Sequence, residues 1–227
     1  MSDIKKSQPS KRLVKLSKLL SLTLRHKAID QGFKINSEGY INLYELLNSD
    51  IYKNYKLDEI VKVVKDNEKN RFKLSRNPSD ESKTEENLLE NSDEVNYWFI
   101  KANQGHSIQI ENLELTPILN HSDFPTIIHG TYEDKWELIK TQGLNRMSRN
   151  HIHFSIGLPG DGEVISGMRT SCKVLIYINL KKAIEDKIPF YISSNKVVLC
   201  PGILNTGILT PEYFEKVVSK SGIELEF

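Results

Sequence analysis

Two arginines and two histidines lie within eight residues of the chain, in the stretch 146–153. From 151 to 155 polar and apolar side chains alternate, which predicts a short β-strand with two different faces. One face would carry the polar side chains His151, His153 and Ser155. The other would bury Ile152 and Phe154, so that the polar row faces a cleft. Arg149 comes just before this strand, where a guanidinium could bind an anion through two hydrogen bonds, although a half-exposed strand with chance histidines would show the same alternation.

A second basic pair, Arg25 and His26, ends a segment with helical spacing. Its apolar stripe consists of Leu13, Leu16, Leu20 and Leu24. With Ser10 as the N-cap, this pattern predicts a helix from about residue 11 to 27. Cations are favoured in the last turn of a helix by its dipole, which is a purely structural reason for the pair. The functional alternative is that the helix end delivers two phosphate-binding groups to a cleft.

The next segments predict a small module of helices followed by a hairpin. A turn into a short strand is predicted at 38–41, and further helices at 43–47 and 57–66. Arg71–Leu74 and Tyr97–Lys101 are predicted to pair as strands. Three helices and a hairpin form a winged-helix-like pattern, which often binds nucleic acid, although the fold alone does not prove it.

Charge is distributed unevenly along the chain, although the net charge is only +1. Residues 1–77 contain 17 Lys and Arg against 9 Asp and Glu, a charge of +8. Residues 78–95 contain 1 against 7, and residues 96–227 contain 13 against 14. A basic first part suggests a polyanionic partner, and a solvated basic face is the plainer explanation. The acidic insert 78–95 is predicted to be an extended hairpin tip.

Beyond residue 102 short strands dominate, and we place a domain boundary near residue 100. Strands are predicted at 126–131, 151–155, 173–179, 190–193 and 196–200. Helices are predicted at 133–142, which Gly143 ends, at 180–186, and at 211–219, which Thr210 caps. The fold class expected for the whole chain is therefore α+β.

Several classes of protein are not favoured by the sequence. No apolar run approaches the roughly 18 residues of a membrane helix, and the polar N-terminus does not resemble a signal peptide. Cys172 and Cys200 lie far apart, and the histidines at 121, 151 and 153 lack ligand spacing, so no metal is expected. The glycine-rich stretch 157–162 opens no helix and matches no dinucleotide fingerprint. A cytoplasmic or nuclear protein is expected.

Six short motifs remain, and their order and spacing resemble those of the RNA 2′-phosphotransferase family, NAD-dependent enzymes that finish tRNA splicing. The resemblance covers nearly the whole chain, from about Leu16 to Phe214. The motifs are Arg25-His26, Asn70-Arg71-Phe72, Gln104-Gly105-His106-Ser107, His129-Gly130-Thr131, Arg149-Asn150-His151-Ile152-His153-Phe154-Ser155 and Asn195-Lys196-Val197-Val198-Leu199.

The resemblance implies two lobes and an NAD site. A winged-helix-like lobe that binds the RNA phosphate would cover residues 1–100, and an ADP-ribosyltransferase-like lobe that binds NAD would cover 101–227. The residues expected to contact NAD are His129, Gly130, Thr131, His153, Ser155 and Val198. Many ADP-ribosyltransferases carry Glu at the position of Val198, and an acceptor phosphate, already anionic, would not need that base.

The resemblance also implies two chemical steps on a tRNA or other RNA with an internal 2′-phosphate. The phosphate first attacks C1″ of the nicotinamide ribose and nicotinamide leaves. The ribose 2″-hydroxyl then attacks the phosphorus and releases RNA with a free 2′-hydroxyl. Negative charge gathers on the phosphoryl oxygens in the second step, which requires fixed cations when no metal is used. The cations expected there are Arg25, Arg71 and Arg149, with His26 to donate or accept a proton.

Two other classes of function stay open. A pure RNA- or DNA-binding module with a degenerate second lobe would have lost Arg25-His26 or the motif at 129–131, and both are present. A protein-modifying ADP-ribosyltransferase would carry a glutamate near Val198 and would not need Arg25-His26.

Overall fold

The structure, a computed structural model, describes residues 10–76, 92–158, 167–204 and 206–227. The expected acidic hairpin tip at 78–95 therefore lies outside the described residues, apart from its last few. The chain forms two compact units. The first comprises Met1–Asn67, Arg71–Ala102 and Ile110–Asn112, and the second Glu68–Asn70, Asn103–Gln109 and Leu113–Phe227.

The first unit begins with the helix that the apolar stripe predicts. Helix α1 (Lys11–Leu22) is followed without a break by a π-helical turn, η1 (Thr23–Lys27). The hydroxyl of Ser10 accepts a hydrogen bond from the backbone N–H of Leu13, as an N-cap does. The predicted span of 11–27 is confirmed, but its last turn is π-helical.

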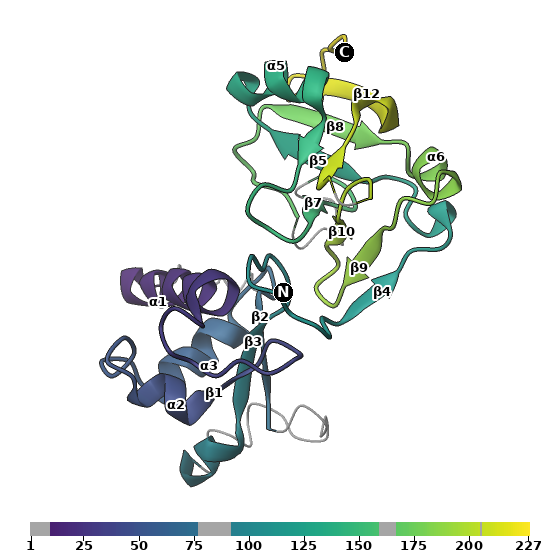
Figure 1. The fold of residues 1–227 in the computed structure, drawn as a ribbon. Helices are drawn as coiled ribbons and strands as arrows, with labels where there is room; N and C mark the ends of the chain where they lie inside the picture. The colour runs from purple at the N-terminus through teal and green to yellow at the C-terminus, as the bar shows by residue number, and fades with distance from the viewer. Residues whose placement is uncertain (1–9, 77–91, 159–166, 205) are drawn as a thin grey trace, which may run out of the picture. The chain divides into compact units, whose positions relative to one another are not determined.

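Among the described residues, the first unit also contains two further α-helices, a 3₁₀ helix η2 (Ser92–Tyr97) and one sheet (Figure 1). The α-helices are α2 (Leu43–Asn48) and α3 (Leu57–Lys65), and the strands are β1 (Ile41–Asn42), β2 (Phe72–Ser75) and β3 (Phe99–Ala102). The strands form an antiparallel sheet in the order β1-β3-β2. Phe72 lies opposite Ala102, so the predicted pairing of these strands is confirmed.

The second unit is built from short antiparallel strands. Its nine strands among the described residues are β4 (Leu115–Pro117), β5 (Ile128–Thr131), β6 (Leu144–Asn145), β7 (Ile152–Phe154), β8 (Val174–Ile178), β9 (Tyr191–Ser193), β10 (Val198–Cys200), β11 (Ile208–Leu209) and β12 (Phe214–Ser219). They form sheets in the orders β4-β9-β10-β7, β12-β8-β5 and β11-β6. A bridge between Ile128 and Ser155 joins the first two sheets, because each residue's N–H donates to the other's carbonyl at 2.9 Å.

Two helices flank these sheets. Helix α5 (Glu133–Gln142) ends at Gly143, whose φ of 85° and close approach to the Leu209 carbonyl require glycine. Helix α6 (Leu180–Glu185) begins at Asn179, whose side chain accepts from the N–H of Lys182. Trp136 of α5 packs on Phe214 of β12, with ring centroids 6.5 Å apart. The predicted helices at 133–142 and 180–186 are thus confirmed.

The helix predicted at 211–219 is wrong. A 3₁₀ turn, η4 (Pro211–Tyr213), leads directly into β12, which pairs along its length with β8. The hydroxyl of Thr210 does not cap a helix but donates to the Glu212 carboxylate at 2.8 Å. The adjacent Val217 and Val218 suit a strand, and pairing with the buried β8 outweighs local helical preference.

Helices and antiparallel sheets are thus both present, so the expected α+β class is confirmed. Within the described ranges, no helix is both long and apolar enough to cross a lipid bilayer.

Candidate functional site

The end of the first helix presents the basic pair. Arg25 and His26 lie in the π-helical turn η1, and both side chains are half-buried. The turn is fixed from inside, where Leu24 and Thr23 are fully buried. The hydroxyl of Tyr52 donates to that of Thr23 at 2.8 Å. A π-helical turn is rare and is often found at functional sites, so the local backbone agrees with a functional role for the pair.

Arg71 lies on a neighbouring element of the same unit. It directly precedes β2, and its Nη1 donates to the side-chain oxygen of Asn67 at 3.1 Å. The side chain is half-buried, and this burial lowers the pKa of Arg71 without removing its charge. Because η1 packs on β3, and β2 pairs with β3, the first unit carries three of the four predicted catalytic residues, Arg25, His26 and Arg71, on adjoining elements.

The backbone just before Arg71 is held by two asparagines. Asn70 has a left-handed φ of 42°, which asparagine tolerates better than most residues. The side-chain amide of Asn103 donates to the Asn70 carbonyl at 2.6 Å, and that of Asn195 donates to the Lys69 carbonyl at 3.0 Å. The Asn195 side chain is itself oriented by the hydroxyl of Ser193, at 2.9 Å. Sequence reasoning noted Asn70 and Asn195 only as motif letters, and it missed Asn103.

In the second unit His129 is held in one tautomer. Its Nδ1 lies 2.9 Å from the backbone carbonyl of His153, and because a carbonyl can only accept, Nδ1 must carry the proton. Burial lowers the pKa of His129, and the charge of Arg149 lowers it further against the opposing effect of the carbonyl. The imidazole is therefore neutral at pH 7, and its Nε2 is a hydrogen-bond acceptor.

The polar row of the opening stretch does not face a cleft in the way that the alternation predicted. Strand β7 is confirmed, and Ile152 and Phe154 do enter the core, but His153 and Ser155 are buried as well. The hydroxyl of Ser155 donates to the Gly157 carbonyl at 2.7 Å. The reason is topological, since β10 pairs with one edge of β7 while β5 meets its end at Ser155.

The remaining predicted NAD residues have clear packing roles. A Cβ on Gly130 would lie 2.3 Å from the sulfur of Met168 and 2.9 Å from that of Cys172, so any larger residue would force these side chains to move. Thr131 is buried, and its carbonyl accepts from the N–H of Lys173 at 2.8 Å. Val198 is fully buried opposite Phe154, next to the His153–Leu199 pair.

Arg149 lies in a turn that a second arginine stabilises. Arg146 Nη1 donates to the Arg149 carbonyl at 3.1 Å, and the Arg149 N–H donates to the Arg146 carbonyl at 3.2 Å. Arg146 also lies over Gly207, where a Cβ would come within 2.5 Å of its Nε. Sequence reasoning counted Arg146 in the basic stretch without giving it this role.

A further cation belongs to the same neighbourhood. Partial desolvation lowers the pKa of Arg149, and the nearby charge of Arg169 lowers it further. Sequence reasoning missed Arg169, because it stands alone after the glycine-rich stretch and carries no motif. Arg149 and Arg169 are both exposed, and the charge of Arg149 also acts on His129, so this part of the second unit suits an anion.

His151 and Asn150 complete the stretch. The ring of His151 meets Tyr191 edge-on, with centroids 6.3 Å apart, and burial followed by the charge of Arg146 lowers the pKa of His151. The N–H of Asn150 donates to the His106 carbonyl at 2.9 Å, so the motif at 104–107 is tied to the same loop. In the part of the chain that the structure describes, no group of three or more His, Cys, Asp or Glu side chains could hold a metal ion.

Comparison with known proteins agrees with the resemblance drawn from the motifs. Residues 11–202 match the family model of the RNA 2′-phosphotransferase, Tpt1 / KptA family. A tRNA 2′-phosphotransferase 1 of Danio rerio is 43% identical over 207 residues, which are 90% of this chain and 85% of that protein. The tRNA 2′-phosphotransferase of Saccharomyces cerevisiae is 36% identical, over 96% of this chain and 89% of its own length. The tRNA 2′-phosphotransferase 1 of Homo sapiens is 37% identical, over 91% and 76%.

Proposed function

The chain belongs to the RNA 2′-phosphotransferase, Tpt1 / KptA family, and on that premise we propose that it transfers the splice-junction 2′-phosphate of tRNA to NAD. The products would be RNA with a free 2′-hydroxyl, ADP-ribose 1″,2″-cyclic phosphate and nicotinamide. NAD would be a substrate that is consumed, not a resident cofactor. The enzyme would act in the cytoplasm or the nucleus, wherever its spliced tRNA is found.

The proposed reaction balances in two steps. A 2′-phosphate oxygen forms a bond to C1″ of the nicotinamide ribose, and the C1″–nitrogen bond breaks with its electron pair going to nicotinamide. The 2″-oxygen then forms a bond to phosphorus, and the bond between phosphorus and the RNA 2′-oxygen breaks. The proton of the 2″-hydroxyl is finally found on the RNA 2′-hydroxyl. No oxidant, reductant or metal is needed.

We assign the phosphate to the first unit. Arg25 and Arg71 offer planar forks that match phosphate oxygens, and each stays charged at any working pH. Their charge would stabilise the phosphorus-centred step, in which negative charge builds on the phosphoryl oxygens. His26 is the side chain of this group that can exchange a proton near neutral pH. We therefore propose a winged-helix-like, RNA-phosphate-binding role for the first unit.

We assign NAD to the second unit, in an ADP-ribosyltransferase-like role. The observation that carries this assignment is the hydrogen bond between His129 Nδ1 and the His153 carbonyl, which leaves Nε2 as an acceptor. A ribose hydroxyl is a suitable donor to it. Arg149 and Arg169 supply positive charge for a pyrophosphate. Four further residues would support the NAD site from below, through their backbone atoms or by packing and not through exposed side chains. These residues are Ser155, Gly130, Thr131 and Val198.

The test is nicotinamide release from NAD. We expect release with an RNA that bears one internal 2′-phosphate, and none with the same RNA bearing a 2′-hydroxyl. An enzyme that modifies proteins would release nicotinamide with a protein acceptor and without the 2′-phosphate. A pure binding module would release none with either RNA, and either result would overturn the proposal.

A further inference from the structure

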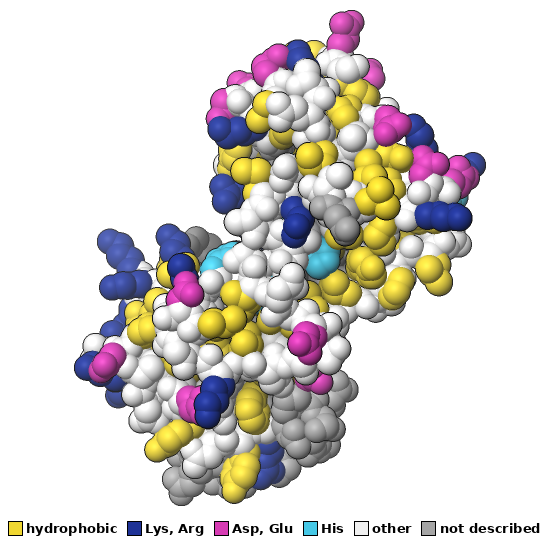
Figure 2. Space-filling model, in the orientation of Figure 1, with side chains coloured by type: hydrophobic (Ala, Val, Ile, Leu, Met, Phe, Trp, Pro, Cys, Tyr) yellow, Lys and Arg dark blue, Asp and Glu magenta, His cyan; other side chains and the backbone are white. Residues whose placement is uncertain are grey.

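Three lysines form a row along the exposed face of α1. Lys11, Lys15 and Lys18 follow one another at intervals of four and three residues, so they lie on one side of the helix. All three side chains are exposed, whereas Leu16 and Leu20 on the opposite side are fully buried. Figure 2 shows Lys and Arg side chains gathered over the part of the first unit where Figure 1 places α1. We call Lys11, Lys15 and Lys18 the α1 lysine row.

The α1 lysine row takes part in no ion pair within the described ranges of the chain. Helix α1 contains no acidic residue. A surface that holds three unneutralised charges of one sign offers electrostatic attraction to a polyanion.

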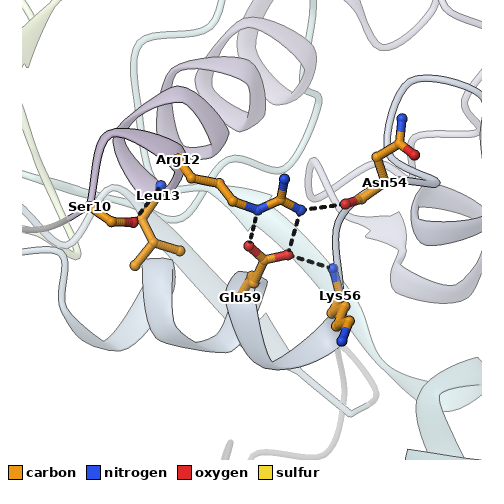
Figure 3. Close-up of polar contacts among 6 residues, drawn as sticks. All are labelled: Ser10, Arg12, Leu13, Asn54, Lys56 and Glu59. Carbon is orange, nitrogen blue, oxygen red and sulfur yellow. Dashed lines mark hydrogen bonds and ion pairs between the residues drawn. The ribbon is translucent and has the colours of Figure 1, made fainter.

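Arg12, on the same helix, differs from the row because its charge is used in contacts within the fold. Its Nε and Nη2 donate to the two carboxylate oxygens of Glu59 in α3, at 2.5 and 3.0 Å (Figure 3). Nη2 also donates to the Asn54 carbonyl, and the guanidinium lies 4.8 Å from the ring centre of Tyr55. Arg12 fixes α1 to α3, and it also neutralises the carboxylate of α3 that lies against α1. The contrast separates the anchored cation from the α1 lysine row.

The row leads to the predicted phosphate-binding pair. Helix α1 runs directly into η1, which carries Arg25 and His26. Lys11 and Arg25 are fourteen residues apart, which corresponds to roughly 21 Å of helix. The N-terminal half of this length carries the α1 lysine row beside the anchored Arg12, and its C-terminal end carries the groups assigned to the 2′-phosphate. A nucleic acid strand with regularly spaced phosphates could contact the α1 lysine row and the Arg25-His26 pair at the same time.

We propose that the α1 lysine row binds the phosphodiester backbone of the RNA that flanks the 2′-phosphate. The proposal rests on the proposed function, because that function supplies the RNA and fixes its reacting phosphate near Arg25 and His26. The row contributes affinity without reading sequence, since contacts to backbone phosphates carry no base information. It would also distinguish substrates by length, because an RNA of two nucleotides reaches the pair but not the row.

The experiment compares two triple variants of equal charge. The first replaces the row (Lys11→Gln, Lys15→Gln, Lys18→Gln). The control replaces three exposed lysines elsewhere that have no ion pair among the described residues (Lys34→Gln, Lys173→Gln, Lys187→Gln). Each variant is assayed with a dinucleotide and with an RNA of about 20 nucleotides, both carrying one internal 2′-phosphate. Circular dichroism and thermal unfolding confirm that each variant is folded.

We expect the row variant to bind the longer RNA on the order of tenfold more weakly at moderate salt, with turnover of the dinucleotide unchanged. Its plot of log K against log salt should lose about 2 units of slope, since each single-strand phosphate contact contributes roughly 0.7. The control variant should match the wild type in its affinity for the longer RNA and in the slope of its salt dependence. If row and control variants bind the longer RNA equally, the inference is wrong, whereas failure of the wild type to turn over either RNA rejects the proposed function instead.

Discussion

At the residue scale, single contacts determine the tautomer or the backbone conformation of a few residues. His129 shows this most clearly, because one carbonyl at 2.9 Å decides which nitrogen carries the proton. Asn70 shows it for the backbone, because its left-handed φ and the amide of Asn103 together fix the peptide group that joins it to Arg71. The sequence predicts the types of these residues but not their partners, since each partner comes from a distant part of the chain.

Arg71 and His26 should serve the phosphorus-centred step more than the first step. Removing one charged donor from such a centre costs about 10²–10³ in rate. We therefore expect Arg71→Ala and His26→Ala to let ADP-ribosylated RNA accumulate before the 2′-hydroxyl product appears, and Arg71→Lys to restore little, because a point charge does not replace a fork. A time course with RNA labelled at the 2′-phosphate resolves the three species. His129→Ala is the contrasting variant, which should slow substrate loss without accumulation.

His129 should titrate below the ordinary histidine value of 6.5, because burial and then Arg149 lower its pKa. Just below pH 6.5, His129 is protonated in the unfolded chain but still neutral in the folded chain. This residue therefore makes the free energy of unfolding fall as the pH drops through 6.5. NMR titration of the imidazole nitrogens, assigned with His129→Asn, measures both the pKa and the Nδ1–H tautomer. A pKa at or above 6.5, or a proton on Nε2 at pH 7, would contradict the assigned acceptor.

At the element scale, the sequence predicts most helices and strands but not the details on which the site depends. The helix at 11–27, the strand pair around Phe72 and the helix at 133–142 follow from local spacing and caps. The π-helical turn does not, because it depends on tertiary contacts of Thr23. The strand β12 was mistaken for a helix for a similar reason, since its partner β8 lies some forty residues earlier.

The π-helical turn should depend on the hydrogen bond between Tyr52 and Thr23. Tyr52→Phe removes the donor from a buried pair and should destabilise the protein by about 1–3 kcal/mol. Thr23→Val should cost a similar amount, and the double variant clearly less than the sum, since both changes remove one interaction. Denaturant unfolding measures the cycle, and activity measured below the unfolding transition reports on Arg25 and His26.

Tyr213→Phe is the matched control for this cycle, because that hydroxyl donates to Asp186 at 3.0 Å in the second unit. It should leave activity near the wild-type value. Strict additivity of Tyr52→Phe and Thr23→Val would show that the hydrogen bond does not hold the turn.

At the scale of the whole molecule, composition and motif order predict the α+β class and the family, and physical detail inside each unit had to come from the structure. The two asparagine contacts before Arg71 join residues that lie 33 and 126 positions apart, so no local sequence pattern predicts these contacts. The burial of β7 depends likewise on strands far away in the sequence. The expected acidic tip at 78–95 lies almost wholly outside the described residues and stays a prediction.

The two cysteines should report on the cooperativity of the second unit. Both are free and buried. Desolvation raises the pKa of Cys172, and it raises the pKa of Cys200 to about 12. We expect neither thiol to react with a disulfide reagent at pH 8 until the unit unfolds, because thiolate is the reactive form. Labelling across a denaturant series, compared with circular dichroism, is the measurement. Fast labelling of Cys200 without denaturant would mean that the core of β10 opens locally.

In the proposed reaction the RNA 2′-phosphate ends on ADP-ribose. The most direct measurement follows an RNA whose single 2′-phosphate carries radioactive phosphorus, incubated with enzyme in the presence or absence of NAD. We expect that label leaves the RNA only when NAD is present and that all of it is recovered as ADP-ribose cyclic phosphate, one per nicotinamide released. Release of label as inorganic phosphate, or any release without NAD, would contradict it.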